Sequence, residues 1–351
     1  MTKERLLTGD RPTGKLHLGH YVGSICNRLK YQNDYDCLFF IADLHMLTTK
    51  KRKEDIIASR NFTKEAMIDY LSCGLDPKKI TFYLQSALPA ISELYLIFSM
   101  LMGINRLYDL PSIKEMAKNA HLDMEAIPLG LLGYPILQAA DILIAKAHSV
   151  PVGRENEPHI ELARDVARRF NQNYGDYFPE PQVMRGEAAA LIGIDGKGKM
   201  SKSANNAIFL SDSREEVEKK VRSMYTDPNR IHQNVPGTVE GNPVFIYLDI
   251  FDKDKALIDG FKERYRAGTV GDVEVKDRLC TVLNEFLDPI REKRKDVAKE
   301  KGFVESILYE GTCKMREETD KTMKEIKSLM GLSGTWNKIS REGRDYLKRG
   351  L

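Results

Sequence analysis

The sequence has little of what marks a metal site, a disulfide scaffold or a membrane protein. Its five cysteines, at positions 26, 37, 73, 280 and 313, form no CxxC pair and no cluster with histidine. This argues against zinc or an iron–sulfur cluster, and an odd number of scattered cysteines suits a reducing compartment. The N-terminus has no apolar signal core, and no apolar run approaches membrane length. These absences predict a soluble cytoplasmic protein without a metal site or a membrane partner.

A strong charge imbalance and internal repeats are also missing. The 351 residues include 54 Lys and Arg against 51 Asp and Glu, so net charge neither favours nor excludes a nucleic-acid partner. Basic runs occur at residues 50–53 and 291–301, but such a run is most often a solvated loop or helix face. The length allows two domains.

The chain changes character after about residue 203. Before it, apolar runs alternate with amphipathic stretches, which predicts strands at residues 6–8, 37–42, 80–84 and 149–152 and helices at 18–32, 55–73, 90–102, 129–145 and 156–171. After it, charged helical patterns dominate, at residues 213–224, 253–265, 272–299 and 303–330. We therefore predict an α/β fold: a Rossmann-like catalytic domain with a parallel sheet (1–208), then an all-helical domain (209–351). The pattern leaves open whether the last helix packs back on the first domain.

The segment after the first expected strand has the composition of a nucleotide-binding turn. Gly9 and Gly14 allow the backbone to turn sharply, and Gly19 lets a nucleotide approach the next helix without meeting a Cβ. His17 and His20 fall on one face of the helix start, where backbone amides also favour phosphate. An HxGH tetrad alone is a weak signal, because two surface histidines give the same pattern.

A second segment strengthens the first. Residues 199–203 are Lys-Met-Ser-Lys-Ser, about 180 residues after HxGH. A loop of this composition can bring two ammonium groups to the pyrophosphate of ATP as charge builds up there. Such a five-residue match arises by chance roughly once in ten thousand chains of this length. The two motifs in this order therefore form a strong joint signal.

Together the motifs resemble the ATP-binding signatures of class I aminoacyl-tRNA synthetases. The likeness extends through residues 224–228 (MYTDP) and 240–245 (EGNPVF), and residues 150–171 look like the tryptophanyl members, where a glycine-led turn contacts the ATP ribose. The resemblance implies catalytic roles for His17, His20, Lys199 and Lys202. It implies ATP contacts for Arg11, Pro12, Thr13, Gly19, His20, Gly153, Arg154, Glu155, Leu191, Lys199, Met200, Ser201, Lys202 and Ser203. Arg11 replaces a neutral amide of the commoner family form, and Arg154-Glu155-Asn156 replaces an acidic residue followed by Asp-Gln.

The apolar stretch 129–145 carries three polar residues on one helical face, Tyr134, Gln138 and Asp141. A carboxylate in such surroundings costs free energy unless it has a partner, and a nearby Arg or Lys is as good a candidate as a ligand. In tryptophanyl and tyrosyl enzymes alike, this position faces the amino acid, and the carboxylate accepts the indole N–H or the phenol O–H. By this resemblance the tryptophan pocket would contain Leu7, Gly9, His45, Tyr134, Gln138, Asp141, Val152 and Asn156. His45 fits an ordinary core or surface histidine equally well.

The motif does not by itself separate tryptophan from tyrosine. Tyrosyl enzymes place a tyrosine at the end of the first strand, where this chain has Leu7, and usually carry a further RNA-binding module. Leu7, Val150 and Val152 suit an indole, whereas Gln138 is more usual in tyrosyl enzymes. The resemblance favours tryptophan, and a tyrosyl enzyme is the nearest alternative. A small-molecule nucleotidyltransferase and a catalytically silent synthetase-like RNA-binding protein are alternatives of other classes.

The resemblance also implies a reaction and partners. The carboxylate of L-tryptophan would attack the α-phosphate of ATP, and the aminoacyl group would pass to the 2′-hydroxyl of tRNA(Trp). The carboxylate is already ionised at neutral pH, so catalysis needs positioning and charge stabilisation and no obligatory base. Mg²⁺ would arrive on the ATP phosphates. The helical domain would bind the anticodon, and the protein would be a symmetric homodimer.

Overall fold

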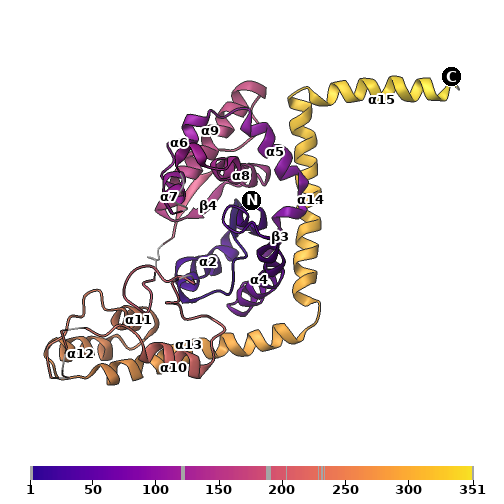
Figure 1. The fold of residues 1–351 in the computed structure, drawn as a ribbon. Coiled ribbons are helices and arrows are strands. Elements are labelled where there is room, and N and C mark those ends of the chain that lie inside the picture. Colours follow the sequence, from indigo (N-terminus) through magenta and orange to yellow (C-terminus); the bar gives the residue numbers. More distant parts are fainter. Residues whose placement is uncertain are drawn as a thin grey trace.

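A parallel sheet organises the fold (Figure 1). The structure, a computed structural model, describes residues 3–119, 123–186, 191–202, 204–227, 229–230, 232 and 234–349. Within them the sheet has the order β3-β2-β1-β4-β5, with β1 (Arg5–Asp10), β2 (Asp36–Ile41), β3 (Ile80–Leu84), β4 (Ser149–Val152) and β5 (Gln182–Arg185). All neighbouring strands pair in parallel. The strand order reverses between β1 and β4, and doubly wound sheets bind ligands outside the carboxyl ends of the strands at such a point.

Helices connect and cover the strands. Up to residue 174 they are α1 (Leu18–His20), a π-helical turn (Tyr21–Ile25), α2 (Cys26–Asp34), α3 (Asp43–Met46), α4 (Lys53–Ser72), α5 (Pro89–Ser99), α6 (Ile104–Tyr108), α7 (Pro111–Asn119), α8 (Leu129–Ile144) and α9 (Glu157–Tyr174). Short 3₁₀ turns lie at Gln85–Ala87, Met124–Ala126 and Arg154–Asn156. The later part contains α10 (Arg214–Arg222), α11 (Pro243–Phe251), α12 (Lys255–Arg266), α13 (Asp272–Lys299), α14 (Phe303–Leu329) and α15 (Leu332–Lys348). Among the described residues, no helix combines the length and apolar character needed to cross a membrane.

The two faces of the sheet belong to different cores. Leu6 and Phe39 join a layer that includes α4 and α13. Their neighbours Leu7 and Leu38 join a layer that includes α5, α8 and α9. Successive side chains of a strand point to opposite faces, so a strand buried on both faces has a continuous apolar sequence, as β2 does.

α14 covers the edge strand β3 (Figure 1). A Cβ on Gly311 of α14 would lie 1.9 Å from the carbonyl oxygen of Phe82, so this approach requires glycine. Thr312 Oγ1 accepts a hydrogen bond from the backbone N–H of Leu84 at 3.1 Å. The helix therefore protects an edge that would otherwise offer unpaired backbone groups.

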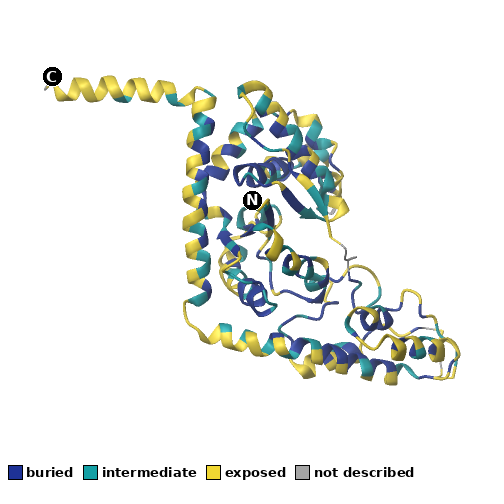
Figure 2. Cartoon of the chain, turned by 180° about the vertical axis from the view of Figure 1, so that it is seen from behind, coloured by how far each residue is buried: buried dark blue, intermediate teal, exposed yellow. Residues whose placement is uncertain are grey.

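The predicted parallel sheet followed by helices is confirmed. The sequence analysis missed β5, whose residues are half-buried or exposed and lack an apolar run. It also missed α15, none of whose residues is buried in the described structure (Figure 2). The predicted division at residues 208/209 stays a prediction. A hydrogen bond from the backbone N–H of Leu210 to the carbonyl of Leu16 joins the two sides of this boundary. α14 packs on the first part of the chain, whereas α15 extends away from it (Figure 1).

Candidate active site

The HxGH segment lies at the carboxyl end of β1. The rings of His17 and His20 have centroids 3.8 Å apart, and His20 Nδ1 accepts a hydrogen bond from the backbone N–H of His17 at 3.2 Å. Gly14 has φ +137°, which fits the predicted turn. The predicted reason for Gly9 is wrong: this residue lies inside β1, and a Cβ there would lie 2.5 Å from the Phe40 ring. Close packing, and not a turn, requires glycine at position 9.

The structure brings the KMSKS segment against HxGH. Met200 Sδ accepts from the backbone N–H of Gly19 at 3.3 Å, and the Met200 backbone N–H bonds to the carbonyl of Leu191 at 2.8 Å. Lys202 Nζ lies 3.4 Å from the position of a Cβ on Gly14. Lys199 is exposed and pairs with Ile192 in an isolated bridge.

A hydrogen bond fixes the middle of the same segment. The backbone N–H of Ser201 bonds to Asn206 Oδ1 at 2.8 Å, a contact that the sequence analysis missed. Ser203 lies outside the described residues. The predicted phosphate-binding segments are therefore neighbours in space, although about 180 residues separate them in the sequence.

Burial and positive charge keep both motif histidines neutral. Burial, then the charges of His20 and Lys202, lowers the pKa of His17 to about 3. Burial lowers the pKa of His20 to about 4, although the nearby Asp10 carboxylate opposes this. Burial also lowers the pKa of Lys202 to about 8. Neutral imidazoles can donate hydrogen bonds near pH 7, and they carry no positive charge there.

An ion pair with Arg28 offsets the negative charge of Asp10 beneath the HxGH segment. Burial favours the neutral acid, but Arg28 and Tyr70 hold the pKa of Asp10 below its usual value. Arg28 Nη1 donates to Asp10 Oδ2 at 2.6 Å and Arg28 Nη2 donates to Thr8 Oγ1 at 3.1 Å, while the Tyr70 hydroxyl also donates to Asp10. Without these partners, a carboxylate at this place would repel phosphate.

The glycine-led turn lies directly after β4, the neighbour of β1 in the sheet. Gly153, Arg154 and Glu155 are exposed, and the backbone N–H of Asn156 closes the turn onto the carbonyl of Gly153 at 2.9 Å. A Cβ on Gly153 would lie 2.5 Å from Glu155 Oε2. Arg11 and Thr13 form a tight turn after β1, with Arg11 exposed and Pro12 buried. β1 and β4 are neighbouring strands, so both turns open at the same end of the sheet.

Asp141 lies at the centre of a buried polar cluster. The residue is 1% exposed, and both of its carboxylate oxygens accept from Gln85 Nε2 at 2.9 Å. His45 Nε2 lies 2.8 Å from Asp141 Oδ2. Gln85 Oε1 in turn accepts the backbone N–H groups of Leu44 and His45. The carboxylate therefore has protein partners, and burial still raises its pKa above the usual value.

Gln85 was missed, although the sequence holds a signal for it. Gln85 directly follows β3, just as His45 closely follows β2. The carboxyl ends of parallel strands meet at one edge of a sheet, so polar residues just after buried strands gather there. This rule, applied to residue 85, would have placed its amide near His45.

His159 connects the remaining pocket residues of α8. Its Nδ1 lies 2.8 Å from Gln138 Oε1, and its Nε2 lies 2.6 Å from Ser112 Oγ and 3.3 Å from Tyr134 Oη. Burial lowers the pKa of His159 to about 4. The Tyr134 ring also meets the His45 ring edge-on, with centroids 6.4 Å apart. Tyr134, Gln138 and Asp141 thus belong to one connected network, as their shared helical face indicated.

Other predicted pocket residues stand apart from this network. Leu7 is 1% exposed and packs in the core layer of α8, while Val152 is half-buried against the same layer. Asn156 ends the turn after β4 and begins α9. Gly9 packs on Phe40, as described above.

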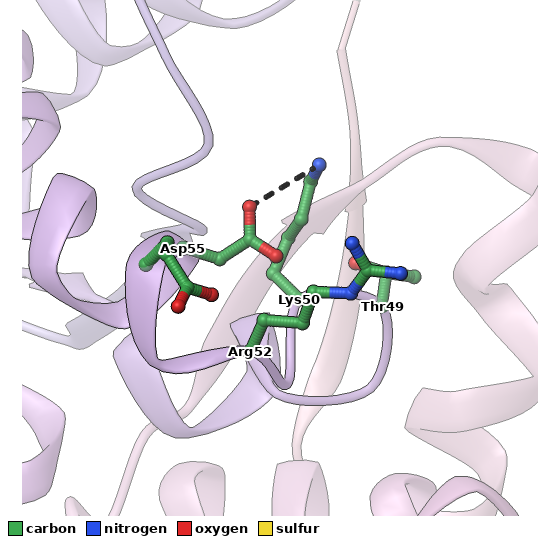
Figure 3. A pocket seen from close by; sticks show the side chains of 5 residues that line it. Thr49, Lys50, Arg52 and Asp55 are labelled. Atoms are coloured by element: carbon green, nitrogen blue, oxygen red, sulfur yellow. Dashed lines mark ion pairs between the residues drawn. The ribbon is translucent and has the colours of Figure 1, made fainter.

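The basic runs have different surroundings. Arg294 pairs with Glu65 and Asp69 of α4, so this part of the run at 291–301 ties α13 to the sheet layer. A hollow of about 540 Å³ lies at the start of α4 and is lined by Thr49, Lys50, Arg52, Glu54 and Asp55. Figure 3 shows the side chains that line it. Its two acidic residues offset its two basic ones, and Lys50 Nζ lies 3.7 Å from Asp55. In the described ranges, no group of three His, Cys, Asp or Glu residues is placed to hold a metal ion.

Comparisons with known proteins identify the family of this chain. Residues 2–288 match the family described as tRNA synthetases class I (W and Y). The chain is 56% identical to a tryptophan--tRNA ligase from Chlamydia caviae, over 95% of this chain and 97% of that protein. It is 52% identical to the one from Borreliella burgdorferi, over 99% of each. A tryptophanyl-tRNA synthetase from Campylobacter jejuni, solved with ADP and tryptophan, superposes with a TM-score of 0.82 at 32% identity, covering 93% of this chain and 99% of that one. The chain belongs to the class I aminoacyl-tRNA synthetases, in the family of tryptophan--tRNA ligases.

Proposed function

We propose that this tryptophan–tRNA ligase binds ATP at the carboxyl end of β1 and L-tryptophan beside Asp141. The observation that carries the proposal is the packing of the KMSKS segment on HxGH after β1. In the same sheet, the residues that follow β2 and β3 bring His45 and Gln85 to the buried carboxylate of Asp141. The Campylobacter enzyme, with ADP and tryptophan in its structure, supports both ligands for this fold.

The ATP phosphates would lie among the two motifs. Lys199 and Lys202 supply positive charge where the pyrophosphate leaves, and neutral His17 and His20 donate hydrogen bonds. The turns at Arg11–Thr13 and Gly153–Glu155 hold the nucleoside, with Gly19 against Met200. Mg²⁺ that enters with ATP would neutralise phosphate charge. Asp10 does not suit a metal ligand here, because Arg28 and Tyr70 occupy its Oδ2.

Tryptophan would lie with its indole towards Asp141. Gln85 and His45 leave the carboxylate fixed in direction, and a carboxylate oxygen has lone pairs for a further donor. The indole N–H is that donor, and the ligand's own carboxylate then points towards the α-phosphate. The carboxylate attacks in line, the P–O bond to pyrophosphate breaks, and tryptophanyl-adenylate forms. The 2′-hydroxyl of tRNA(Trp) next attacks the mixed anhydride and releases AMP.

The helical part of the chain, from residue 209 onwards, would bind the tRNA anticodon, and two copies would form a symmetric dimer. The helices α10 to α13 support this division, because they gather at one end of the molecule (Figure 1). We place the reaction in the cytoplasm, which the five free cysteines support.

ATP–pyrophosphate exchange with purified protein tests the proposal. L-tryptophan should support exchange at least about a hundredfold better than L-tyrosine. Asp141 could accept a hydrogen bond from either ligand, so the expected preference rests on Leu7, Val150 and Val152, whose apolar side chains suit an indole. Charging of tRNA(Trp) should follow with the same amino acid. Equal exchange with tyrosine would remove the assignment of tryptophan to this pocket.

A further inference from the structure

A short antiparallel contact joins the segments that carry the two motifs. Residues 16–18 lead into HxGH, and residues 208–210 follow KMSKS. Two hydrogen bonds between their backbone amide nitrogens and carbonyl oxygens, of 2.9 and 3.0 Å, hold the stretches together, with His17 opposite Phe209. We call this contact the 17–209 bridge. It fixes the start of one motif to the chain that leaves the other.

Asp69 of α4 holds the HxGH side of the bridge. Its Oδ2 accepts a hydrogen bond at 3.3 Å from the backbone N–H of Leu16, the residue directly before His17. The Asp69 side chain is buried, and α13 passes along α4 at this place (Figure 1). Arg294 of α13 donates to the other carboxylate oxygen of Asp69 and also to Glu65. Because a buried carboxylate needs a charged partner, Arg294 both supports Asp69 and fixes its direction.

The charge of Asp69 also reaches the second motif. Burial raises the pKa of Asp69, and the positive charge of Arg294 opposes this rise. Burial lowers the pKa of Lys202, and the charges of Asp10 and Asp69 oppose that change. Asp69 therefore lies within electrostatic reach of the KMSKS lysine while its oxygen holds the amide that precedes His17.

Arg291, one turn before Arg294 on α13, holds the KMSKS side of the bridge. Its Nε donates to the backbone carbonyl of Asp212 at 2.8 Å. Asp212 Oδ2 accepts the backbone N–H of Phe209 at 2.8 Å and the ammonium group of Lys220 at 2.6 Å. Residues three apart lie on one face of a helix, so a single face of α13 contacts both strands of the bridge. Each arginine acts through an aspartate that accepts a backbone N–H of the bridge.

We propose that Arg294 and Arg291 of α13 are positioning residues for adenylate formation, which hold HxGH against KMSKS through Asp69 and Asp212. The inference rests on the ATP site of the proposed function and adds the residues that set its geometry. Neither arginine needs to touch the reacting atoms. A displacement of about 1 Å in a group that stabilises a transition state can cost on the order of a hundredfold in rate. A helix from the later part of the chain thereby contributes to chemistry at the end of β1.

Variants at Arg294 and Asp69 test the HxGH side. In ATP–pyrophosphate exchange, Arg294→Met should lower kcat about tenfold and change KM for tryptophan less than about twofold, because its contacts lead to the ATP end. Arg294→Lys keeps a charged donor and should recover most of the lost rate. Asp69→Asn keeps an acceptor for the Leu16 amide, so it should be milder than Asp69→Ala.

Arg278→Met is the matched control on the same helix. Arg278 Nε and Nη2 donate to the two carboxylate oxygens of the buried Asp252 at 2.7 and 2.9 Å. This ion pair ties α13 to the end of α11 and not to the bridge. Its loss should lower the melting temperature, as the loss of Arg294 should, but leave kcat unchanged. Pyrophosphate exchange needs no tRNA, so the proposed role of the helical part in tRNA binding does not enter this comparison.

Deuterium uptake at the Leu16 amide reports the hydrogen bond itself. Arg294→Met and Asp69→Ala should each speed uptake at this amide about tenfold, because the bond to Asp69 is weakened or lost. Arg278→Met should leave uptake at Leu16 at the parent rate. A change in overall stability alone would not single out this amide.

The outcomes separate this inference from the proposed function. Equal losses of kcat in Arg294→Met and Arg278→Met would overturn the inference, since lost stability would then explain both. Faster deuterium uptake at Leu16 with unchanged kcat would also overturn it. If His17→Ala leaves pyrophosphate exchange at the parent rate, the proposed ATP site itself fails. Exchange that depends on His17 but not on Arg294 would keep the proposed function and reject the positioning role of α13.

Discussion

The ATP end and the amino-acid end of the proposed active site differ in the residues that form them. The proposed ATP end consists of two contiguous motifs and carries the ammonium groups of Lys199 and Lys202. Contacts between distant segments, such as that from Gly19 to Met200, bring the motifs together. The proposed amino-acid end consists of residues from separate elements around the buried carboxylate of Asp141, among them His45 after β2, Gln85 after β3 and His159 of α9. In the proposed function, one end would meet a charged ligand with charge, and the other would meet a mostly apolar ligand with one oriented hydrogen bond.

This difference assigns different work to each end. Charge that acts on a leaving pyrophosphate matters most in the transition state, so it should appear in kcat. An oriented hydrogen bond to a bound side chain should appear in kcat/KM for the amino acid and in selectivity. Variants at the two ends should therefore affect different kinetic constants.

Lys202→Ala should have the largest effect at the ATP end. We expect kcat for adenylate formation to fall about a hundredfold or more while KM for ATP changes little, because the ammonium group acts on developing charge. Lys197→Ala, at an exposed lysine of the same glycine-rich segment, is the matched control and should stay near the parent rate. A loss confined to ATP affinity, with kcat unchanged, would place Lys202 in ground-state binding.

Gln85→Met should affect the amino-acid end alone. It removes the donor to both Asp141 oxygens, so the pKa of Asp141 should rise further and kcat/KM for tryptophan should fall about tenfold. KM for ATP should not change. Gln32→Met, at another buried glutamine bonded to backbone groups, controls for lost stability. Equal losses for both variants would mean that Gln85 only supports the fold.

The pH profile should report Lys202. Its pKa of about 8 means that the charged form dominates below pH 8, so kcat/KM for ATP should fall about tenfold per pH unit well above it. Lys202→Arg keeps its charge beyond pH 12 and should remove this descending limb at some cost in rate. A limb that persists unchanged in the arginine variant would belong to another group.

The two motif histidines should show the smallest effects when a donor is kept. His17→Asn and His20→Asn should each lose a few-fold in kcat, and the Ala variants about tenfold, since the amide still donates a hydrogen bond. Their pKa values of about 3 and about 4 leave both rings neutral from pH 5 to 7, so no limb near pH 6.5 is expected. A limb there that disappears in the Asn variants would indicate proton transfer.

The sequence predicted the ATP end better than the amino-acid end, for a physical reason. A motif of consecutive residues can be recognised from the sequence alone, so HxGH and KMSKS could be identified before their contact was known. Gln85 reaches Asp141, and His159 reaches Gln138, only because the fold brings the turn after β3 and the helix α9 to α8. The role assigned to Gly9 failed likewise, because the Phe40 ring that excludes a Cβ comes from the next strand.

α14 and α15 show the same limit. The periodicity of residues 303–330 predicted α14 well, because one face of that helix packs on the core through buried residues such as Gly311, Met315 and Met323. α15 carries an equally regular apolar stripe, formed by Leu332, Trp336, Ile339, Tyr346 and Leu347. These side chains are exposed in the described structure, so the sequence could not say what the stripe packs against.

The most direct test of the proposed site measures whether Asp141 accepts the indole N–H of tryptophan. Adenylate formation is measured for the parent and Asp141→Ala, each with L-tryptophan and with an analogue methylated on the indole nitrogen. For tryptophan, Asp141→Ala should cost about 2–4 kcal/mol in kcat/KM, because the variant loses the acceptor for the indole N–H. For the methylated ligand, which cannot donate, the loss should be far smaller, giving a clear coupling in the double cycle. Equal losses for both ligands would mean that Asp141 serves only its bonds to Gln85 and His45, and that the indole N–H is recognised elsewhere.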